Sequence, residues 1–309
     1  MLEPLCRPRR LLRGDRVSVV APSGVLDPGR LDRGVGLLGE LGLDVVVGAH
    51  ARDVHGPFAG TDADRAADVQ GAWTDPAVRA VLCARGGYGV TRMLDHLDWA
   101  AMAARPDPPV LLGASDITAL HLAVARRLGV ATLFGPMPAA QILAGDHPEP
   151  ATLRHLVLTL AAPDRVQVLT GAGVRVLVAG AAAGVTTGGT LSLLAGALGT
   201  PEAPSFAGGV VFLEDVNEAP YRIDRMLTQL LRAGALDGVR AVVAGSWERC
   251  GTTAEVDDVL RERLGGLGVP VLAGFEFGHG PVQVTVPLGV RARVDSAAGT
   301  VTLEEPALA

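Results

Sequence analysis

Short hydrophobic runs alternate with longer amphipathic runs through the first half of the chain. The short runs are rich in β-branched residues, which favours strands, and the longer runs repeat their apolar positions at helical spacing. The predicted strands are 17–20, 45–47, 80–83 and 110–112, and the predicted helices are 30–41, 63–73, 90–97 and 117–128. This alternation predicts a parallel α/β sheet, in which functional groups gather just past the carboxyl ends of the strands.

The pattern changes between residues 145 and 174, where a helix over 151–160 is flanked by proline-containing turns. Beyond it, the predicted strands are 174–178, 210–213, 239–243, 271–273, 282–286, 290–294 and 300–303, the predicted helices are 191–198 and 221–232, and a glycine-rich turn is predicted at 187–189. We therefore expect an N-terminal α/β domain over 1–145, a linker over 146–173 and a mixed α/β C-terminal domain over 174–309.

Composition places the chain among globular proteins. Its 309 residues are 49% hydrophobic and 19% charged, which excludes a disordered or collagen-like polypeptide. A chain of this length forms one large domain or two modest ones, and either can bury the core that an enzyme requires.

All 27 basic residues are arginines, because the chain contains no lysine. A pyridoxal-phosphate Schiff base, a lysine-activated serine and a Walker-type phosphate loop each need a lysine amine and are therefore excluded. The formal charge of -6 and the absence of a long basic run argue against nucleic acid as a partner.

Three widely spaced cysteines suggest neither a disulfide framework nor a zinc cluster. The arginine-rich N-terminus lacks the apolar segment of a signal peptide, and the most apolar stretch, 176–185, is far shorter than the ~20 residues that cross a bilayer. We expect a soluble protein of the reducing cytoplasm, with no metal and no membrane partner.

Ser115 follows the predicted strand 110–112 in the sequence Gly-Ala-Ser-Asp and opens a helical pattern. This strand-turn-helix context is typical of a nucleophile elbow, although Ile117 replaces the second glycine of that motif. The alternative is that Ser115 or Asp116 caps the following helix. Cys83, which ends another strand, is a competing nucleophile, but a buried structural thiol is the simpler interpretation.

A glycine-rich loop, Arg-Gly-Gly-Tyr-Gly over 85–89, follows the strand 80–83. Its amides are suited to holding a negative charge, but its spacing departs from the dinucleotide-binding fingerprint. An oxyanion hole and a plain tight turn both remain open from the spacing.

Carboxylates and a histidine follow later strands. Glu214 and Asp215 come directly after the strand 210–213, where a carboxylate can orient a histidine, whereas helix capping is the preferred interpretation for Asp215 and Glu218. His279 lies between two glycines in a loop, where it is either a general base or a solvated histidine.

Taken in order, these motifs resemble the LD-carboxypeptidase family of serine peptidases, which includes muramoyltetrapeptide carboxypeptidase and the microcin C immunity peptidases. The motifs are APSG at 21–24, RGGYG at 85–89, GASDITAL at 113–120, GGTLS at 188–192, LED at 213–215, PYRIDR at 220–225 and GHG at 278–280. The resemblance implies a flavodoxin-like N-terminal domain, related to class I amidotransferase-like folds, and a smaller α/β C-terminal domain.

The same resemblance implies a Ser-His-Glu triad. Carried over by motif, Ser115 is the nucleophile, His279 the general base and then acid, and Glu214 the residue that orients His279. The amides of Gly87 and Asp116 are the implied oxyanion hole. Two departures from the family pattern are Ala114, where a bulkier residue is common, and Thr190, where asparagine is common.

The implied reaction is hydrolysis of the amide before a terminal D-alanine in murein tetrapeptides recycled within the cell. With no lysine available, Arg85, with Gly86 beside it, is the candidate for binding the free carboxylate of the departing residue. No cofactor is implied, and a homodimer is weakly expected. The alternatives are an immunity-type peptidase that cleaves aminoacyl-nucleotide amides, with Trp247 as a possible stacking partner, and a non-catalytic protein that binds murein peptides.

Overall fold

Two β-sheets organise the computed structural model, which describes residues 1–309. The N-terminal sheet has the strand order β12-β5-β4-β3-β1-β2, and only β12 runs antiparallel to its neighbour. Its strands are β1 (Arg16–Val20), β2 (Asp44–Val47), β3 (Val78–Cys83), β4 (Val110–Gly113), β5 (Thr132–Phe134) and β12 (Val286–Leu288). The predicted parallel α/β sheet is therefore confirmed.

Helices connect the parallel strands of this sheet. The connecting helices are α1 (Pro28–Glu40), α2 (Asp62–Thr74), the short α3 (Val90–Met93) and α4 (Trp99–Ala103), and α5 (Thr118–Leu128). Local chemistry fixes where they begin: Asp27 accepts a hydrogen bond from the Arg30 amide at the start of α1, and Thr61 and Asp64 form a capping box on α2.

The second sheet has eight strands in the order β6-β14-β13-β8-β9-β10-β11-β7. Its parallel centre consists of β8 (Ala181–Thr190), β9 (Gly209–Val216), β10 (Ala241–Glu248) and β11 (Val271–Ala273). The antiparallel strands are β6 (Val168–Leu169), β7 (Arg175–Val178), β13 (Arg291–Asp295) and β14 (Thr300–Leu303). The remaining helices are α6 (Gln141–Ala144), α7 (Pro150–Ala161), α8 (Leu191–Gly196), α9 (Pro220–Arg232) and α10 (Thr253–Leu264).

The predicted glycine-rich turn at 187–189 is wrong, because β8 runs through it to Thr190. Gly188 (φ +122°) and Gly189 (φ +140°) have backbone conformations that favour glycine, and a Cβ on Gly188 would lie 2.0 Å from the carbonyl oxygen of Phe212. The glycines thus allow β8 to pair closely with β9 instead of reversing the chain. The predicted strand 282–286 is displaced, since β12 begins at Val286.

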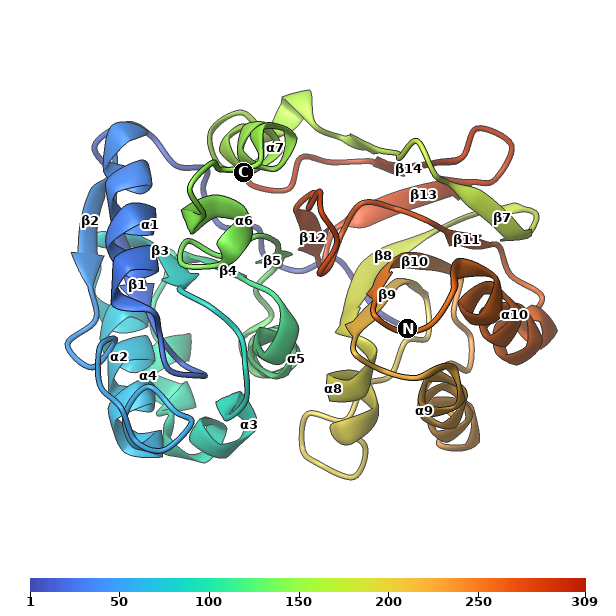
Figure 1. Ribbon diagram of the computed structural model, residues 1–309, viewed down its shortest axis with the longest axis horizontal. Helices are drawn as coiled ribbons and strands as arrows, with labels where there is room; N and C mark the ends of the chain where they lie inside the picture. The colour runs from blue at the N-terminus through green and yellow to red at the C-terminus, as the bar shows by residue number, and fades with distance from the viewer.

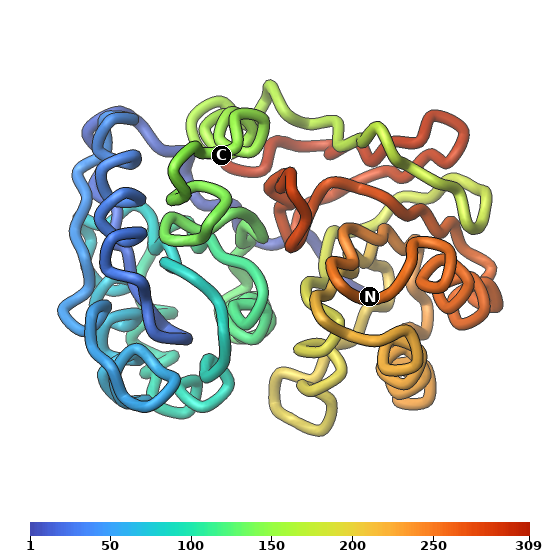
Figure 2. Tube along the Cα trace, in the orientation of Figure 1, coloured from blue at the N-terminus to red at the C-terminus, as the bar shows by residue number.

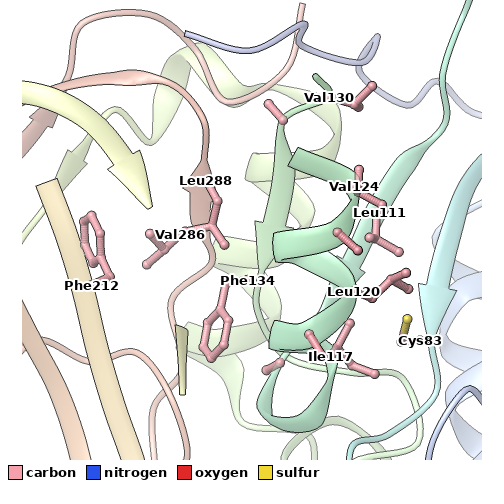
Figure 3. Packing of buried hydrophobic residues seen from close by; sticks show 14 of the residues in the cluster. Cys83, Leu111, Ile117, Leu120, Val124, Val130, Phe134, Phe212, Val286 and Leu288 are labelled. Atoms are coloured by element: carbon pink, nitrogen blue, oxygen red, sulfur yellow. The ribbon is translucent and has the colours of Figure 1, made fainter. Parts of the chain in front are cut away.

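A shared apolar core joins the two sheets (Figure 1). β12, which lies late in the chain, pairs with β5 of the N-terminal sheet. Phe134 of β5 packs edge-on against Phe277, which packs in the same way against Phe212 of β9. Figure 3 shows Phe134 beside α5, and Val286 between α5 and Phe212. The division into 1–145, 146–173 and 174–309 stays a prediction, and its two larger parts share one core.

Both ends of the chain are tied to distant residues, as the trace in Figure 2 shows. The Leu2 amide donates to the carbonyl of Ala207, and the Ala309 amide donates to the carbonyl of Pro8. None of the helices has the length and apolar character that crossing a membrane requires.

Candidate active site

Ser115 lies in a 3-10 turn between β4 and α5, at the carboxyl end of the parallel strand. Its φ of +61° is unusual for a residue with a side chain, and only Asn217 and Arg249 share this property. A Cβ on Gly113 would lie 2.7 Å from Ile117, so the sharp turn before Ser115 needs glycine there. Such strained turns cluster at functional sites, and the half-buried Ser115 has the backbone geometry of a nucleophile elbow.

The helix-capping alternative for Ser115 and Asp116 is wrong, because neither side chain caps the turn or α5. The Asp116 carboxylate, only 2% exposed, instead accepts hydrogen bonds from the Ser23 hydroxyl at 2.6 Å and the Val90 amide at 3.0 Å. Burial raises the pKa of Asp116. Asp116 therefore ties the Ser115 turn to the loops that follow β1 and β3.

The glycine-rich loop 85–89 lies against Ser115. A Cβ on Gly86 would lie 2.7 Å from the Ser115 Cβ, so only glycine permits this approach. Gly87 has a φ of +133°. The amides of Gly87 and Asp116 donate to no acceptor within the protein. Two unpartnered amide donors thus lie close to the Ser115 turn.

Two arginines hold this loop in different ways. Exposed Arg85 donates from Nε to the Gly86 carbonyl at 3.0 Å and from Nη1 to the Val25 carbonyl at 2.8 Å. Buried Arg65 donates from Nη1 to the carbonyls of Pro22 at 2.7 Å and Gly89 at 2.9 Å. Arg65 could not be identified from the sequence, since an arginine on an amphipathic helix is usually exposed to solvent.

Glu214 and His279 form a hydrogen-bonded pair. Glu214 lies at the carboxyl end of β9 with 0% exposure, and its Oε2 is 2.7 Å from His279 Nδ1. The Thr190 hydroxyl, at the end of β8, donates to Glu214 Oε1 at 2.5 Å. Sequence reasoning noted Thr190 only as a departure from the family pattern; the structure identifies it as the second partner of Glu214.

The charge of Glu214 controls the ionisation of His279. Burial alone lowers the pKa of His279, but the hydrogen bond and negative charge of Glu214 outweigh burial, so the pKa is raised above the ordinary histidine value. A Cβ on Gly278 (φ +99°) would lie 2.4 Å from Glu214 Oε2. Glycine before His279 therefore allows the loop to approach the buried carboxylate.

A hydrogen bond to α5 connects the Ser115 turn with the pair formed by Glu214 and His279. The Thr190 amide donates to the Thr118 hydroxyl at 3.1 Å, and Thr118 follows Ser115 by one turn. The Ser115 hydroxyl itself forms no hydrogen bond with His279 in this structure. Catalytic hydrogen bonds often form only in the substrate complex, so the arrangement is compatible with a serine, histidine and carboxylate acting together.

The other acidic residues have structural partners. Asp215 accepts hydrogen bonds from the amides of Ser192 at 2.7 Å, in the first turn of α8, and Val216 at 2.8 Å, and burial raises its pKa to about 6. Glu218 pairs with Arg222 at 3.4 Å. Asp215 thus holds the first turn of α8, in agreement with the capping interpretation, whereas Glu218 forms no side-chain cap at the start of α9, so the predicted capping hydrogen bond is wrong there.

Cys83 is fully buried in the core, as Figure 3 shows. Burial raises the pKa of the Cys83 thiol, which keeps it protonated. Potential cation ligands lie where the loop after β2 meets the start of α2, and atoms of His50, Asp53 and Asp64 come within 4.8 Å of one another there. Asp64 is already engaged there in the capping box with Thr61.

Comparison of the amino-acid sequence with known protein families identifies the family of this chain. Residues 17–135 match the LD-carboxypeptidase N-terminal domain and residues 183–294 match the LD-carboxypeptidase C-terminal domain. The chain belongs to the LD-carboxypeptidase family and is a carboxypeptidase, a hydrolase.

Among its relatives, the probable murein peptide carboxypeptidase of Bacillus subtilis is 36% identical, covering 96% of this chain and 94% of that protein. The murein tetrapeptide carboxypeptidase of Pseudomonas aeruginosa is 32% identical, covering 89% and 91%. The crystal structure of muramoyltetrapeptide carboxypeptidase from Oxalobacter formigenes is similar with a TM-score of 0.80 at 32% identity, covering 93% of this chain and 97% of that one. The two-domain α/β fold that the resemblance implied is confirmed.

Proposed function

We propose that this carboxypeptidase cleaves the amide before a terminal D-alanine in murein tetrapeptides through a triad of Ser115, His279 and Glu214. The observation that carries the proposal is the 2.7 Å contact between Glu214 and His279 Nδ1, which comes from a buried carboxylate. This contact holds the hydrogen on Nδ1 and leaves the Nε2 lone pair free to accept a proton.

In the proposed reaction, the Ser115 oxygen attacks the amide carbonyl while His279 Nε2 takes the hydroxyl proton. The imidazolium then gives that proton to the departing nitrogen, and D-alanine leaves. Water, activated by the same imidazole, hydrolyses the acyl-enzyme and restores Ser115. Glu214 stabilises the imidazolium in both halves of the reaction.

The proposed oxyanion hole consists of the amides of Gly87 and Asp116. Their lack of an internal acceptor supports this role, because an oxyanion then gains two hydrogen bonds without breaking any. The strained φ of Ser115 supports its proposed role as the nucleophile, since this conformation turns a nucleophile away from the strand into the site.

We propose that Arg85, beside Gly86, binds the carboxylate of the departing D-alanine. Its Nε and Nη1 are engaged by main-chain carbonyls, which fix the guanidinium and leave Nη2 for the substrate. Two relatives, at 36% and 32% identity, are named as murein peptide and murein tetrapeptide carboxypeptidases, and their names support this substrate. We further propose a cytoplasmic role in peptidoglycan recycling; a homodimer stays a prediction.

The test is incubation of the purified protein and its Ser115→Ala variant with a murein tetrapeptide that ends in D-alanine. We expect D-alanine release, followed by mass spectrometry, from the unmodified protein alone. Equal release from both proteins would contradict the role of Ser115. No release by either, with unchanged peptide binding, would favour the non-catalytic alternative.

A second candidate is cleavage of aminoacyl-nucleotide amides, the chemistry suggested by a structural neighbour. The microcin C7 self-immunity protein MccF, solved in complex with glutamyl sulfamoyl guanosine, has a TM-score of 0.88 at 24% identity, covering 99% of both chains. A cavity of about 260 Å³ lined by Trp247 and Gly280 favours this candidate, because an aromatic ring there can stack on a base.

One difference from MccF argues against the cleavage of aminoacyl-nucleotide amides. An active-site mutant of MccF has a serine, an asparagine and a lysine replaced, whereas this chain has no lysine. Incubation with aspartyl sulfamoyl adenosine separates the two candidates, since we expect no cleavage of that compound.

A further inference from the structure

A second cavity of the protein lies outside the candidate active site. It has a volume of about 310 Å³, and none of Ser115, Glu214 and His279 lines it. Its walls come from α5, β8, the chain around 202–207, the first residues of the protein and the end of β12. Both halves of the chain therefore contribute to it.

A buried hydrogen-bond acceptor belongs to this cavity. His121, on α5, lines the cavity and is only 2% exposed. Its Nε2 lies 3.0 Å from the Gly113 carbonyl, and because a carbonyl only accepts, Nε2 carries the hydrogen. Burial lowers the pKa of His121 to about 4, so the ring is neutral near pH 7. Nδ1 is then a lone pair, and it has no partner in the structure.

A free positive charge lies farther along the same helix. Arg126 lines the cavity, is exposed and pairs with no carboxylate, whereas its neighbour Arg127 pairs with Glu202 at 2.5 Å. A helix rises about 1.5 Å per residue, so the backbone of Arg126 lies about 7.5 Å along the axis from that of His121. The cavity therefore has a buried acceptor and an exposed cation at different heights along one helix.

The space between these two groups is largely apolar. Leu122 lies between them on α5. Val185 belongs to β8, Phe206 lies in the loop between α8 and β9, and Leu288 ends β12. A buried acceptor, apolar walls and a cation at the rim are the features of a specific small-molecule site.

We propose that this cavity binds a small elongated organic anion. The ligand has an apolar body, an N–H or O–H donor that reaches His121 Nδ1, and a carboxylate that pairs with Arg126. Because Nε2 of the same ring holds the Gly113 carbonyl, at the start of the Ser115 turn, the ligand contacts a residue that supports the candidate active site. The inference does not rest on the proposed hydrolysis, and its test measures binding alone.

The probe is indole-5-carboxylate, which carries a ring N–H at one end and a carboxylate at the other. Titration into the full chain, followed by isothermal calorimetry, is expected to give saturable binding at one site. 1-Methylindole-5-carboxylate has the same body and charge without the donor, and we expect its Kd to be about fivefold higher, the range of one hydrogen bond. Equal affinity for the two probes, or no binding by either, would overturn the proposal.

Matched variants locate the site. His121→Phe keeps an aromatic ring but removes the acceptor, so it is expected to abolish the preference between the two probes, whereas Arg126→Gln weakens both equally. Since His121 is buried and its replacement risks misfolding, Ala125→Trp at a partly buried lining position provides a second variant that fills the cavity. Unchanged probe binding in folded Ala125→Trp would also overturn the proposal.

Discussion

Glu214 has one oxygen for each of its two donors. Oε1 accepts from the Thr190 hydroxyl at 2.5 Å, and Oε2 lies 2.7 Å from His279 Nδ1. The carboxylate is therefore held on both sides, and because a carboxylate oxygen only accepts, Oε2 keeps the hydrogen of His279 on Nδ1. Thr190 acts through Glu214 and is a positioning residue.

Glu214→Gln is expected to lower kcat/KM for the murein tetrapeptide by roughly 10³–10⁴-fold, as when an amide replaces a triad carboxylate elsewhere. The Thr190 hydroxyl donates to the amide oxygen, so the amide NH₂ faces His279 Nδ1. His279 must then carry its hydrogen on Nε2, which prevents that nitrogen from accepting the Ser115 proton. Steady-state kinetics measure the loss.

Thr190→Val is the matched control. It removes one hydrogen bond but retains the charge of Glu214, so we expect a loss of about tenfold. A loss as large as that of Glu214→Gln would show that Thr190 has more than a positioning role.

The ionisation of His279 gives a pH prediction. Its pKa is raised, so the imidazole stays protonated to a higher pH than a free histidine does. A general base must be neutral; kcat/KM is therefore expected to rise with pH and to level off above the pKa of His279. NMR titration of the ring in Ser115→Ala measures that pKa directly.

In Glu214→Gln the pKa of His279 is expected to fall below the ordinary histidine value. Burial, which lowers the pKa, then acts without the opposing carboxylate. An unchanged pKa would mean that Glu214 does not control the ring.

Among the secondary-structure elements, the loops at the carboxyl ends of strands contribute most residues of the candidate site. The loops after β3, β4 and β11 contribute Gly87, Ser115 and His279, while β9 itself contributes Glu214. Glycines set the distances between these segments, because Gly86 lies against Ser115 and Gly278 lies against Glu214. The geometry of the site therefore depends on positions that have no side chain.

Gly278→Ala is expected to reduce activity by about 100-fold or more while the protein still folds, since small displacements of catalytic groups have effects of this size. The added Cβ would lie 2.4 Å from Glu214 Oε2, and the alanine would have to adopt a φ of +99°, which is unfavourable for a residue with a side chain. The loop must shift, and His279 moves with it. Kinetics together with circular dichroism separate lost activity from lost folding.

Gly280→Ala is the control on the other side of His279. Its φ is outside the region that favours glycine, and the nearest atom to its Cβ would be the Ser246 Cβ at 3.1 Å. We expect a much smaller effect; equal losses in the two variants would mean that general loop strain, rather than the Glu214 contact, limits activity.

Much of this element pattern could be predicted from the sequence. The strands 271–273 and 300–303 match β11 and β14, and the order of motifs placed Ser115, Glu214 and His279 at strand ends. The pattern could not predict that β8 continues through Gly188, because glycine is typical of turns and its role depends on β9, a distant strand. For the same reason Arg65 was missed: its carbonyl partners, on Pro22 and Gly89, come from tertiary structure.

The apolar core that the two sheets share links the stability of one sheet to that of the other. β12 pairs with β5, and the rings of Phe134, Phe277 and Phe212 form a continuous contact from one sheet to the other. The N-terminal sheet thus contains a strand from the second half of the chain, and packed aromatic rings join it to the second sheet.

The two sheets are expected to unfold together. Hydrogen exchange followed by mass spectrometry should give the same opening free energy for β4 and for β9. Phe277→Ala is expected to lower both values by the same amount, about 3–5 kcal/mol. A decrease confined to β9 would show that the halves unfold independently.

His279 follows Ser115 in the chain, and this order has a consequence for synthesis. Ser115 and its glycine loop leave the ribosome before His279 and before β12, which joins the N-terminal sheet. On the proposed chemistry, a nascent chain that has not reached residue 279 carries a nucleophile without its base and hydrolyses nothing. The first appearance of activity during synthesis then reports that translation has passed His279.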